Sequence, residues 1–574
     1  MPHVVTQSCC SDASCVFACP VNCIHPTPDA PDFLQAEMLY IDPEACVDCG
    51  ACAEACPVDA IVPHTKLSDS HAEYAQINED FFREPRPRTP LALVPVSEVI
   101  ADQTAKLRVA VVGSGPAALY VADELLKQRG VQVNVFEKLP TPHGLVRYGV
   151  APDHQSTKKV TGLFGMIAAQ DNFEFYLGVE VGKDITPEEL AAHHHAVVYA
   201  YGASGDRHLN IPGEELEGSV AATEFVAWYN GHPDYADRNF DLSHERAVIV
   251  GNGNVALDVA RILTTDPDEL AKTDISRHAL EALRDSKIRE VVLLGRRGAA
   301  QAAYTLPEFH GLIRKHKAEF VIDKDELVLD EQTVQLRADG TLDPQIERKI
   351  ELAEEIALRI PGGGNERRIV FRYLASPTGI LGDTHVTGVS VVHNKLVTGD
   401  DGKVRPQPTA NAEVIDAGLV LRSVGYRGKP LAGMPFDYDR AVIPNEAGRV
   451  LNRAGGSQLP GAYVCGWIKR GPSGFIGTNK SCAKETVDNL VADFNAGTLP
   501  EPQPKVREIG KLVRSRQPNV IDSVGWQRID QTELQVGAAE GSVRRKLTKI
   551  EDLIASAQAP QRHGLNRVLH LGRK

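Results

Sequence analysis

The chain has 574 residues, of which 43% are hydrophobic and 24% charged, and this length and composition indicate a globular protein of two to four domains. Its formal net charge of −14 argues against nucleic-acid binding, which normally needs a basic excess. No run approaches the roughly 18 to 20 apolar residues of a membrane span, and the first residues lack the basic and apolar regions of a secretory signal. We therefore expect a cytoplasmic protein that binds neither nucleic acid nor membrane.

The amino-terminal segment, residues 1–65, is rich in cysteine. Nine of the eleven cysteines lie between Cys9 and Cys56, which indicates a local ligand set. The run Cys46-x2-Cys49-x2-Cys52-x3-Cys56-Pro57 has the spacing of bacterial ferredoxins, in which three cysteines bind one cubane cluster and the fourth reaches the other cluster. Cys19-Pro20 repeats the end of this motif, so Cys19 is predicted to complete the cluster held by Cys46, Cys49 and Cys52. The segment is predicted to be a small α+β ferredoxin domain.

The first half of this repeat has Asp12 where a ligand cysteine is expected. A carboxylate is a harder and more labile iron ligand than a thiolate. The second site is therefore predicted to hold a [3Fe–4S] cluster on Cys9, Cys15 and Cys56, or a [4Fe–4S] cluster with Asp12 at its fourth corner. Cys10 in place of Cys9 remains an alternative ligand.

A zinc site or a disulfide framework fits the cysteines less well than iron–sulfur clusters. Zinc favours two CxxC pairs with a longer separation and does not account for the paired Cys-Pro halves. A disulfide framework is disfavoured in a cytoplasmic protein, whereas clusters kept only for structure stay open. Cys23 fits no ligand position and is expected to be a buried thiol or one that lies beside a cluster without binding it.

Residues 66–105 lack clear periodicity and are predicted to form an extended linker. Four prolines are spaced through them: Pro85, Pro87, Pro90 and Pro95.

A first dinucleotide-binding motif follows the linker. A buried-strand pattern at 107–112 leads into Gly113-x-Gly115-x-x-Ala118, then into a helical stretch to about Arg129 and a second strand that ends before Glu137. Gly113 permits the tight turn, and Gly115 lets the backbone approach a pyrophosphate. An acidic residue at the position of Glu137 is expected to bind a ribose 2′-hydroxyl, so this site is predicted to take FAD or NAD.

A second motif of the same kind ends differently. The strand at 247–250 leads into Gly251-x-Gly253-x-x-Ala256 and a helix to about 263, and the partner strand at 291–295 ends at Arg296-Arg297. Two guanidinium groups suit a 2′-phosphate, which favours NADP over NAD. A solvated basic pair is the alternative. Two tandem dinucleotide folds suggest a nicotinamide that passes hydride to a flavin.

The predicted fold class is α/β, with two three-layer Rossmann-like domains behind the ferredoxin domain. A strand near 461–466 and a helix from about Thr478 return to the first of them. The predicted FAD domain is discontinuous, at 106–205 and 410–497, and encloses an NADP domain at 206–409. Residues 498–574 form a polar extension with two helix-like segments and no assigned role.

Three runs carry a resemblance to a known family: 144–154 (GLVRYGVAPDH), 251–258 (GNGNVALD) and 466–478 (GWIKRGPSGFIGT). They closely resemble the adrenodoxin-reductase-like ferredoxin–NADP reductases, from about 107 to 495. With the amino-terminal ferredoxin, the chain resembles the mycobacterial fused ferredoxin/ferredoxin–NADP reductases along nearly its whole length. The resemblance implies FAD in the first site, NADP(H) in the second, and electron exchange with a ferredoxin or another one-electron carrier protein. It leaves the oligomeric state open.

The resemblance also implies site residues. The FAD adenosine and pyrophosphate are expected at Ala117, Glu137, Leu145 and Val181, and the isoalloxazine end at Trp467, Gly474, Phe475 and Ile476. The NADP pyrophosphate is expected at Asn252, Gly253, Asn254 and Val255, with Arg207, Arg296 and Arg297 near phosphates.

Two side chains are candidates for a direct part in the reaction. Glu308 is expected near the nicotinamide half, and Gly474 where nicotinamide meets flavin. His154 lies in a loop expected to approach the flavin, where it tunes the potential, relays a proton, or is only structural. The family places a second acidic residue three positions after that of Glu308, but this chain has Gly311 there, which puts a proton relay in doubt.

Two further features are assigned no chemistry. The run His193-His194-His195 is expected to be a solvated helix end rather than a metal site. Cys465 and Cys482 are far apart in sequence and form no CxxC motif, which argues against the redox disulfide of pyridine-nucleotide disulfide reductases.

The function that uses every feature is NADPH reduction of FAD followed by one-electron transfer to iron–sulfur clusters. The alternative is an electron-input subunit of the glutamate-synthase type, which would need a partner subunit.

Overall fold

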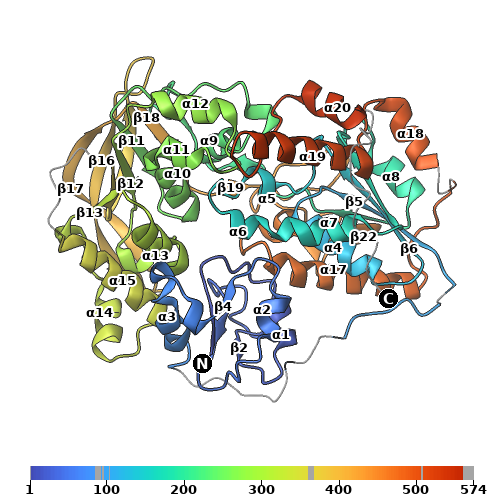
Figure 1. The fold of residues 1–574 in the computed structure, drawn as a ribbon, viewed down its shortest axis with the longest axis horizontal. Coiled ribbons are helices and arrows are strands. Elements are labelled where there is room, and N and C mark those ends of the chain that lie inside the picture. Colours follow the sequence, from blue (N-terminus) through green and yellow to red (C-terminus); the bar gives the residue numbers. More distant parts are fainter. Residues whose placement is uncertain are drawn as a thin grey trace.

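The computed structural model describes residues 2–83, 92, 96–102, 104–359, 367–503, 505 and 508–559. The chain folds into a small amino-terminal domain, two units built on mainly parallel sheets, and a carboxy-terminal extension (Figure 1). No helix in the described residues is long and apolar enough to cross a bilayer.

The amino-terminal domain is built from two matching halves. Strand β1 pairs with β4 and β2 pairs with β3, both antiparallel, while helices α1 and α2 pack together. The left-handed residues Ser11 and Ala13 recur 37 positions later as Asp48 and Gly50, the same interval that separates Cys9 from Cys46. The predicted internal repeat is thus a repeat of backbone geometry. The elements are β1 (His3–Val5), α1 (Ser14–Ala18), β2 (Ile24–His25), β3 (Tyr40–Ile41), α2 (Ala51–Ala55) and β4 (Ile61–Pro63).

The first nucleotide-binding unit contains a seven-stranded sheet of order β20-β21-β22-β8-β5-β6-β7. Its central strands are fully buried because both faces are covered, which explains their continuous apolar runs. The elements before the second unit are β5 (Leu107–Val112), α4 (Pro116–Leu126), β6 (Val131–Glu137), α5 (Leu145–Tyr148), α6 (Gln155–Lys158), α7 (Val160–Ala168), β7 (Phe173–Leu177), α8 (Pro187–His193) and β8 (Ala196–Tyr199). Those after it are β20 (Asn445–Glu446), β21 (Arg449–Leu451), β22 (Gln458–Val464), α16 (Trp467–Arg470) and α17 (Thr478–Asn495).

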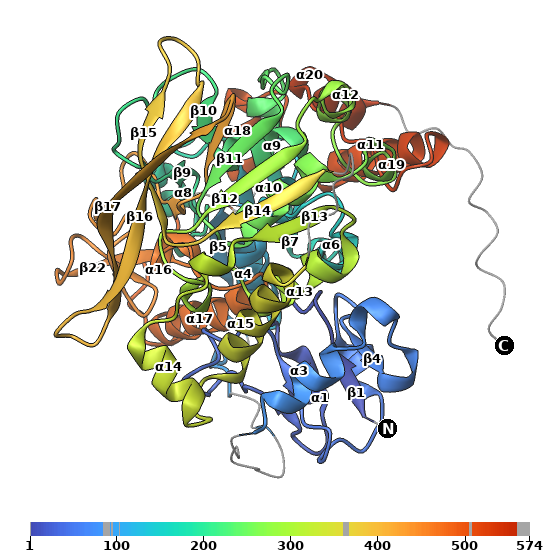
Figure 2. The same ribbon diagram turned by 90° about the vertical axis from the view of Figure 1, so that its left-hand side faces the viewer.

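The second unit contains a six-stranded parallel sheet of order β10-β18-β11-β12-β14-β13, with a three-stranded antiparallel sheet, β15-β16-β17, beside it (Figure 2). Its elements up to β14 are, in chain order, β10 (Ser219–Ala221), α9 (Ala222–Tyr229), η3 (Pro233–Tyr235), β11 (Arg246–Val250), α10 (Asn254–Thr264), α11 (Pro267–Leu270), α12 (Arg277–Asp285), β12 (Glu290–Leu294), η4 (Ala299–Gln301), α13 (Leu306–Lys315), β13 (Glu319–Ile322), η5 (Lys324–Glu326), α14 (Glu331–Ala338), α15 (Pro344–Ala357) and β14 (Arg368–Arg372). The remaining strands are β15 (Ala375–Leu381), β16 (Gly388–Thr398), β17 (Val404–Asp416) and β18 (Leu419–Arg422).

The chain crosses between the two units twice, and the two crossings lie side by side. Strand β9 (Gly205–Asp206) on the outward crossing pairs with β19 (Tyr426–Arg427) on the return. The return crossing lies later than the sequence predicted, because β18 pairs with β10 and β11 in the second sheet. The expected boundary at 409/410 is therefore wrong: it cuts β17 and would assign β18 to the first unit.

The segment after the amino-terminal domain is not an extended linker from its start. Short helices η1 (His64–Lys66) and η2 (Asp69–His71) lead into α3 (Tyr74–Asp80). Asn78 on α3 is buried and bonds the backbone of Val5 and Ile41, while the Tyr74 hydroxyl donates to the Pro307 carbonyl of the second unit at 3.0 Å. These hydrogen bonds hold residues 66–83 against the amino-terminal domain and the second unit. Most of the proline-containing stretch, with Pro85, Pro87, Pro90 and Pro95, lies outside the described residues.

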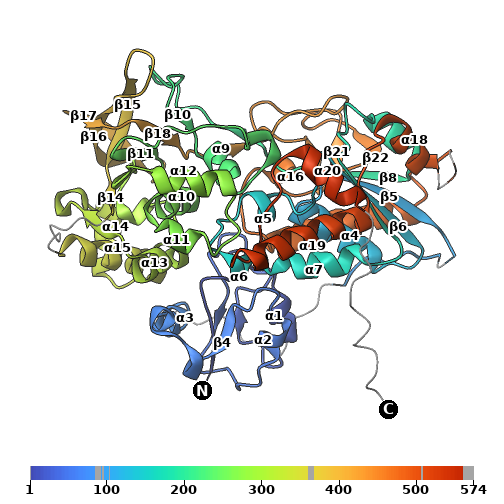
Figure 3. The ribbon, with the colours of Figure 1, turned by 45° about the horizontal axis from the view of Figure 1, so that its top comes forward.

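The carboxy-terminal extension contains three helices, α18 (Glu508–Arg516), α19 (Ser523–Ala539) and α20 (Ile550–Gln558), one more than the sequence predicted. They cover the first unit, next to α7 and α8 (Figure 3). Glu533 of α19 has no exposed surface and forms a double hydrogen bond with Arg147 of α5, at 2.9 and 2.6 Å. The extension thus closes over the loop that follows β6.

Candidate functional site

The first glycine-rich loop follows β5 and opens α4. Gly113 has φ of 105°, and a Cβ there would lie 2.6 Å from the Ala200 carbonyl oxygen, so no other residue fits this turn. Helix α4 begins at Pro116. The backbone amides of Ala117 and Ala118 therefore lie in its first turn and have no hydrogen-bond partner within the helix. A helix start of this kind, behind a glycine turn, suits a pyrophosphate.

Glu137 lies at the end of β6, directly beside this loop. Its Oε2 accepts hydrogen bonds from the Ser114 amide at 3.0 Å and the Ser114 hydroxyl at 2.8 Å, and its Oε1 accepts from the Leu139 amide at 3.0 Å. Burial raises the pKa of Glu137, and these bonds work against that shift. The carboxylate is thus fixed at the edge of the loop, where a ribose hydroxyl would approach.

The other residues expected around the adenosine converge on the same edge. Gly144, at φ of 48°, lies against Gly115 and places Leu145 at the start of α5. The Val179 amide donates to the Glu137 carbonyl at 2.8 Å, which brings Val181 beside the end of β6. Leu145 thus follows a residue that contacts the glycine-rich loop, and Val181 follows a residue that bonds the end of β6.

The expected flavin end lies where β22 leads into α16 and α17. A Cβ on Gly466 would come within 2.5 Å of Ala117 Cβ, so α16 begins directly against the start of α4. Trp467 Nε1 donates to the Ser473 carbonyl at 3.1 Å, which folds the 474–476 turn back over α16. Thr478 and Asn479 bond the Phe475 carbonyl and fix the turn from the other side.

The second glycine-rich loop has the same construction. A Cβ on Gly251 would lie 2.2 Å from the Ser423 carbonyl oxygen, and Gly253 precedes α10. Asn254 Oδ1 accepts from the Thr305 amide at 2.8 Å. This bond holds the start of α13, and with it Glu308, against the loop that comprises Asn252, Gly253, Asn254 and Val255.

Arg296 and Arg297 lie at the carboxyl end of β12, next to that loop. Gly295 makes this possible, since a Cβ there would meet Asn252 Nδ2 at 2.5 Å. Neither guanidinium pairs with a carboxylate of the described residues, and burial together with the charge of Arg296 lowers the pKa of Arg297. Two uncompensated cations at this edge are suited to an anion. Arg207 comes from another element, the β9 crossing, where its amide donates to the Gly425 carbonyl at 3.1 Å.

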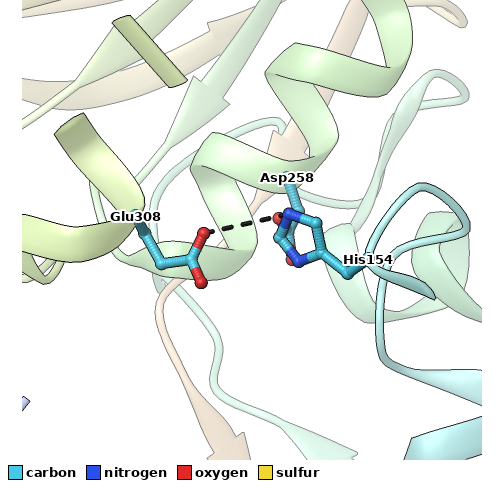
Figure 4. A group of neighbouring side chains, drawn as sticks. All are labelled: His154, Asp258 and Glu308. Carbon is cyan, nitrogen blue, oxygen red and sulfur yellow. Dashed lines mark ion pairs between the residues drawn. The ribbon is translucent and has the colours of Figure 1, made fainter. Parts of the chain in front are cut away.

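His154, Asp258 and Glu308 meet between the two nucleotide-binding units (Figure 4). One nitrogen or oxygen atom from each lies within 4.8 Å of the others, and His154 Nε2 is 3.9 Å from Glu308 Oε2. They come from the loop before α6, from α10 and from α13. The sequence pointed to His154 and Glu308 separately and to no role for Asp258.

A buried arginine links this group to the loop of the first unit. Arg261 bonds Asp153 at 2.6 and 3.0 Å and Asp258 at 2.8 Å. Burial opposes ionisation of Asp153, but Arg261 and His154 outweigh it and hold the pKa of Asp153 well below its usual range. Burial raises the pKa of Asp258. The carboxyl groups thus have opposite tendencies to hold a proton, which is typical of functional sites.

The amino-terminal domain reaches the same place through Gln7, a residue that no sequence pattern singled out. Gln7 Nε2 donates to Glu308 Oε2 at 3.0 Å, and Lys315 donates to Gln7 Oε1 at 2.7 Å. A Cβ on Gly311 would lie 2.4 Å from the Gln7 amide group. The absence of an acidic side chain at 311 therefore makes room for the amino-terminal domain.

The cysteines form two sets within that domain. One, called the Asp12-side set below, comprises Cys9, Asp12, Cys15 and Cys56. Burial, together with the neighbouring Cys56 and Asp12, raises the pKa of Cys9 to about 11. The other, called the all-cysteine set, comprises Cys19, Cys46, Cys49 and Cys52. After burial, the neighbours that raise the pKa of Cys52 are Cys46, Cys19 and Cys49.

Each set thus includes one cysteine from the other half of the repeat: Cys56 in the Asp12-side set and Cys19 in the all-cysteine set. Thiolates gathered in two sets of this composition suit iron–sulfur clusters. Cys23 is buried, with its sulfur 3.4 Å from that of Cys19.

Asp12 is already engaged by protein groups. Its oxygens accept hydrogen bonds from the Ser14 amide at 3.1 Å and the Ser14 hydroxyl at 2.6 Å, and Lys480 Nζ is 3.5 Å away. This arrangement satisfies the carboxylate without a metal ion.

One expectation about unassigned residues needs correction, and one contact was not expected. His193 is half-buried and ends α8, but His194 and His195 are buried, and His194 bonds Asn134 at 2.9 Å inside the first unit, so two of the three histidines are not solvated. The sulfur atoms of Cys465 and Cys482 lie 3.7 Å apart. Sequence separation gave no sign of this contact, because β22 and α17 become neighbours only through the fold.

Comparisons with known proteins agree with this architecture. Residues 107–300 match the pyridine nucleotide-disulphide oxidoreductase family, and residues 39–62 match the 4Fe-4S binding domain. A probable ferredoxin/ferredoxin–NADP reductase of Mycobacterium bovis is 52% identical over 580 residues, covering 99% of this chain and 97% of the relative. NADPH-ferredoxin reductase FprA of Mycobacterium tuberculosis is 44% identical over 461 residues, covering 78% of this chain and 98% of the relative. The solved structure of that FprA in complex with NADPH matches with a TM-score of 0.74 and 42% identity, over 79% of this chain and 100% of that chain.

Proposed function

Because the chain belongs to the ferredoxin–NADP reductases that carry an amino-terminal ferredoxin domain, we propose that it exchanges electrons between NADP(H) and a ferredoxin or another one-electron carrier. Relatives that join a ferredoxin to the reductase match along almost the whole chain, so the reductase replaces the alternative of a glutamate-synthase-type electron-input subunit.

The observation that carries the proposal is the difference between the two strand ends. In the first unit, β6 ends at Glu137, which is fixed beside the phosphate loop, whereas in the second unit Arg296 and Arg297 follow the end of β12. A carboxylate suits an adenosine with a free 2′-hydroxyl, and a pair of arginines suits a 2′-phosphate. We therefore place FAD in the first unit and NADP(H) in the second.

The residues present fit a flavin in the first unit. The backbone at Gly113 leaves no space for a side chain, and the amides that open α4 face the loop without helical partners. Bound flavin supplies the conversion between the two-electron chemistry of nicotinamide and the one-electron chemistry of iron–sulfur clusters. Ala117, Glu137, Leu145 and Val181 would hold its nucleotide end, and Trp467 with Gly474, Phe475 and Ile476 its ring end.

The group of His154, Asp258 and Glu308 would orient the nicotinamide half of NADP(H). Both nucleotide-binding units contribute to it, and Arg261 fixes Asp153 and Asp258 at once. Since transfer of a hydride requires mainly stacking and orientation, a rigid polar group at the boundary between the units is what the reaction needs. Glu308 accepts from Gln7, which holds its carboxylate in place.

Anaerobic mixing with NADPH tests the proposal. We expect NADPH to bleach the flavin absorbance and NADH to do so far more slowly, because only NADPH carries the phosphate that Arg296 and Arg297 face. Stopped-flow absorbance measures both rates. Retention of the oxidised flavin spectrum after mixing with NADPH would contradict the function itself.

In the ferredoxin domain we propose one [4Fe–4S] cluster on the all-cysteine set and one [3Fe–4S] cluster on Cys9, Cys15 and Cys56. The support for three ligands at the second site is the engagement of Asp12 by Ser14 and Lys480. An Asp12-ligated [4Fe–4S] cluster is the other possibility that the sequence leaves open.

Asp12→Cys tests the assignment. We expect iron to rise from about seven to about eight ions per chain, with loss of the [3Fe–4S] EPR signal of the oxidised protein, because a thiolate completes the fourth corner. Iron and sulfide analysis with EPR on anaerobically purified protein measures both. Asp12→Asn is the control that keeps the shape and adds no thiolate. Eight ions per chain in the parent protein, without a [3Fe–4S] signal, would reject the assignment.

A further inference from the structure

The two cysteine sets differ in their surroundings. Helix α17, whose first turn follows the expected flavin-binding turn at 474–476, touches the loop of the Asp12-side set. The Gly477 amide donates to the Cys10 carbonyl at 2.7 Å. A Cβ on Gly477 would lie 2.2 Å from the Asp12 nitrogen, so the two backbones are as close as they can be.

One turn along α17, Lys480 continues this contact. Its ammonium group donates to the Ser14 hydroxyl at 2.8 Å and lies 3.5 Å from Asp12 Oδ2. The Ser14 hydroxyl in turn donates to the same Asp12 oxygen. Lys480 therefore brings a positive charge from the first nucleotide-binding unit to the edge of the Asp12-side set.

Apolar packing also connects the end of the ferredoxin domain that carries the Asp12-side set to the first unit. Cys10, Val58 and Ala60 are buried in one hydrophobic cluster with the core of α4, and Ile476 packs against that cluster. Cys9 and Cys56 also pack against it, although they contact the cluster of the ferredoxin domain and the second unit as well, to which Cys15 belongs. This end of the ferredoxin domain therefore shares an apolar core with the first unit.

The all-cysteine set faces elsewhere. Cys49 is exposed, and the adjacent Val47 is 60% exposed. The remaining ligands of this set belong to or pack against the hydrophobic cluster of the ferredoxin domain and the second unit. The loop around Cys49 is thus open to solvent and to a partner protein.

From this arrangement we infer that electrons pass between the flavin and the all-cysteine set through the Asp12-side set, and that Lys480 is the positioning residue that sets the potential of the Asp12-side cluster. The inference rests on the proposed function, because it needs a flavin at the 474–476 turn. The all-cysteine set, with Cys49 at its exposed edge, is then the station that exchanges electrons with the external carrier.

Lys480→Met tests the inference, with Lys484→Met as the matched control. Lys484 lies one turn further along the same helix and bonds Ser97 and Asp488 instead of the ferredoxin domain. A nearby cation favours the reduced, more negative form of a cluster. We therefore expect Lys480→Met to lower the reduction potential of the Asp12-side cluster and leave the all-cysteine cluster unchanged, with no shift in Lys484→Met. EPR-monitored redox titration measures both potentials.

Freeze-quench EPR after mixing with NADPH gives the order directly. We expect the Asp12-side signal to change before any all-cysteine signal, and Lys480→Met to slow this first change without affecting flavin bleaching, because the lower potential weakens the driving force from the flavin to the Asp12-side cluster. Reduction of the all-cysteine cluster first, or an equal shift of both potentials in Lys480→Met, would overturn the inference. Flavin bleaching in the same samples keeps this failure separate from failure of the proposed function.

Discussion

Replacing Arg296 and Arg297 together with alanine is expected to raise the KM for NADPH by about 100-fold and to leave the KM for NADH almost unchanged. A hydrogen bond to a charged group contributes about 1.5 to 3 kcal/mol, and two such groups face the expected 2′-phosphate. Neither arginine is paired with a carboxylate of the described residues, so their removal leaves no stranded partner there.

Ferricyanide is the suitable electron acceptor for this measurement, because it accepts from the flavin and makes the result independent of the clusters. Arg289→Ala is the matched control, since this exposed arginine precedes the opposite end of the same strand, β12. The phosphate assignment would be wrong if the double variant lost NADPH and NADH activity in equal proportion. It would also be wrong if Arg289→Ala had the same effect as the double variant.

Glu533→Gln is expected to destabilise the first nucleotide-binding unit by about 3 to 5 kcal/mol, the usual result of leaving a buried charge without its partner. Glu533 is fully buried and accepts from Arg147, Arg544 and the Leu547 amide. Its loss leaves the Arg147 guanidinium uncompensated beneath α19. The same contacts hold α5, which carries Leu145, so flavin release is expected to accompany the early unfolding.

Flavin fluorescence during heating measures this release, since the chain is too large for a single two-state unfolding free energy. Glu540→Gln is the control, because Glu540 forms its ion pairs at the more exposed end of the same helix. Exposed pairs contribute about 0 to 1 kcal/mol, so little change is expected. The double variant Arg147→Met/Glu533→Leu should recover part of the loss. Equal release temperatures for Glu533→Gln and the parent protein would show that the extension is not a clamp.

Local patterns in the sequence predicted the elements that carry the site. The continuous apolar run at 107–112 is β5, and the glycine-rich loops at 113–115 and 251–253 open α4 and α10 as expected. These features depend on neighbouring residues, since a buried parallel strand and a left-handed turn each leave a signature within a few positions.

Contacts between distant segments were beyond the reach of the same patterns. Gln7 has no motif around it and bonds Glu308, 301 positions away. Strand β18 resembles any short apolar strand, and only its pairing with β11 assigns it to the second unit. Proline spacing suggested an extended linker, whereas Asn78 is buried on a helix because its amide satisfies backbone groups of two strands.

The fold gives Gly311 a physical reason that the sequence did not reveal. The sequence showed a missing carboxylate near Glu308, which weakens the case for a proton relay. The fold shows that Gln7 occupies the space that a side chain at 311 would need. Gly311 therefore affects the docking of the ferredoxin domain as well as the chemistry near Glu308.

The amino-terminal domain packs closely against Gly311 and Gly477. This packing also affects how the rate of electron transfer depends on protein concentration. Two separate proteins must collide for each electron that they exchange, so their rate falls with concentration. Here both partners share one chain, and the local concentration of one at the other is fixed by the linkage. Internal electron transfer is therefore a first-order event, equally fast in a crowded or a dilute solution, and encounters are needed only to bind NADP(H) and to exchange electrons with an external carrier.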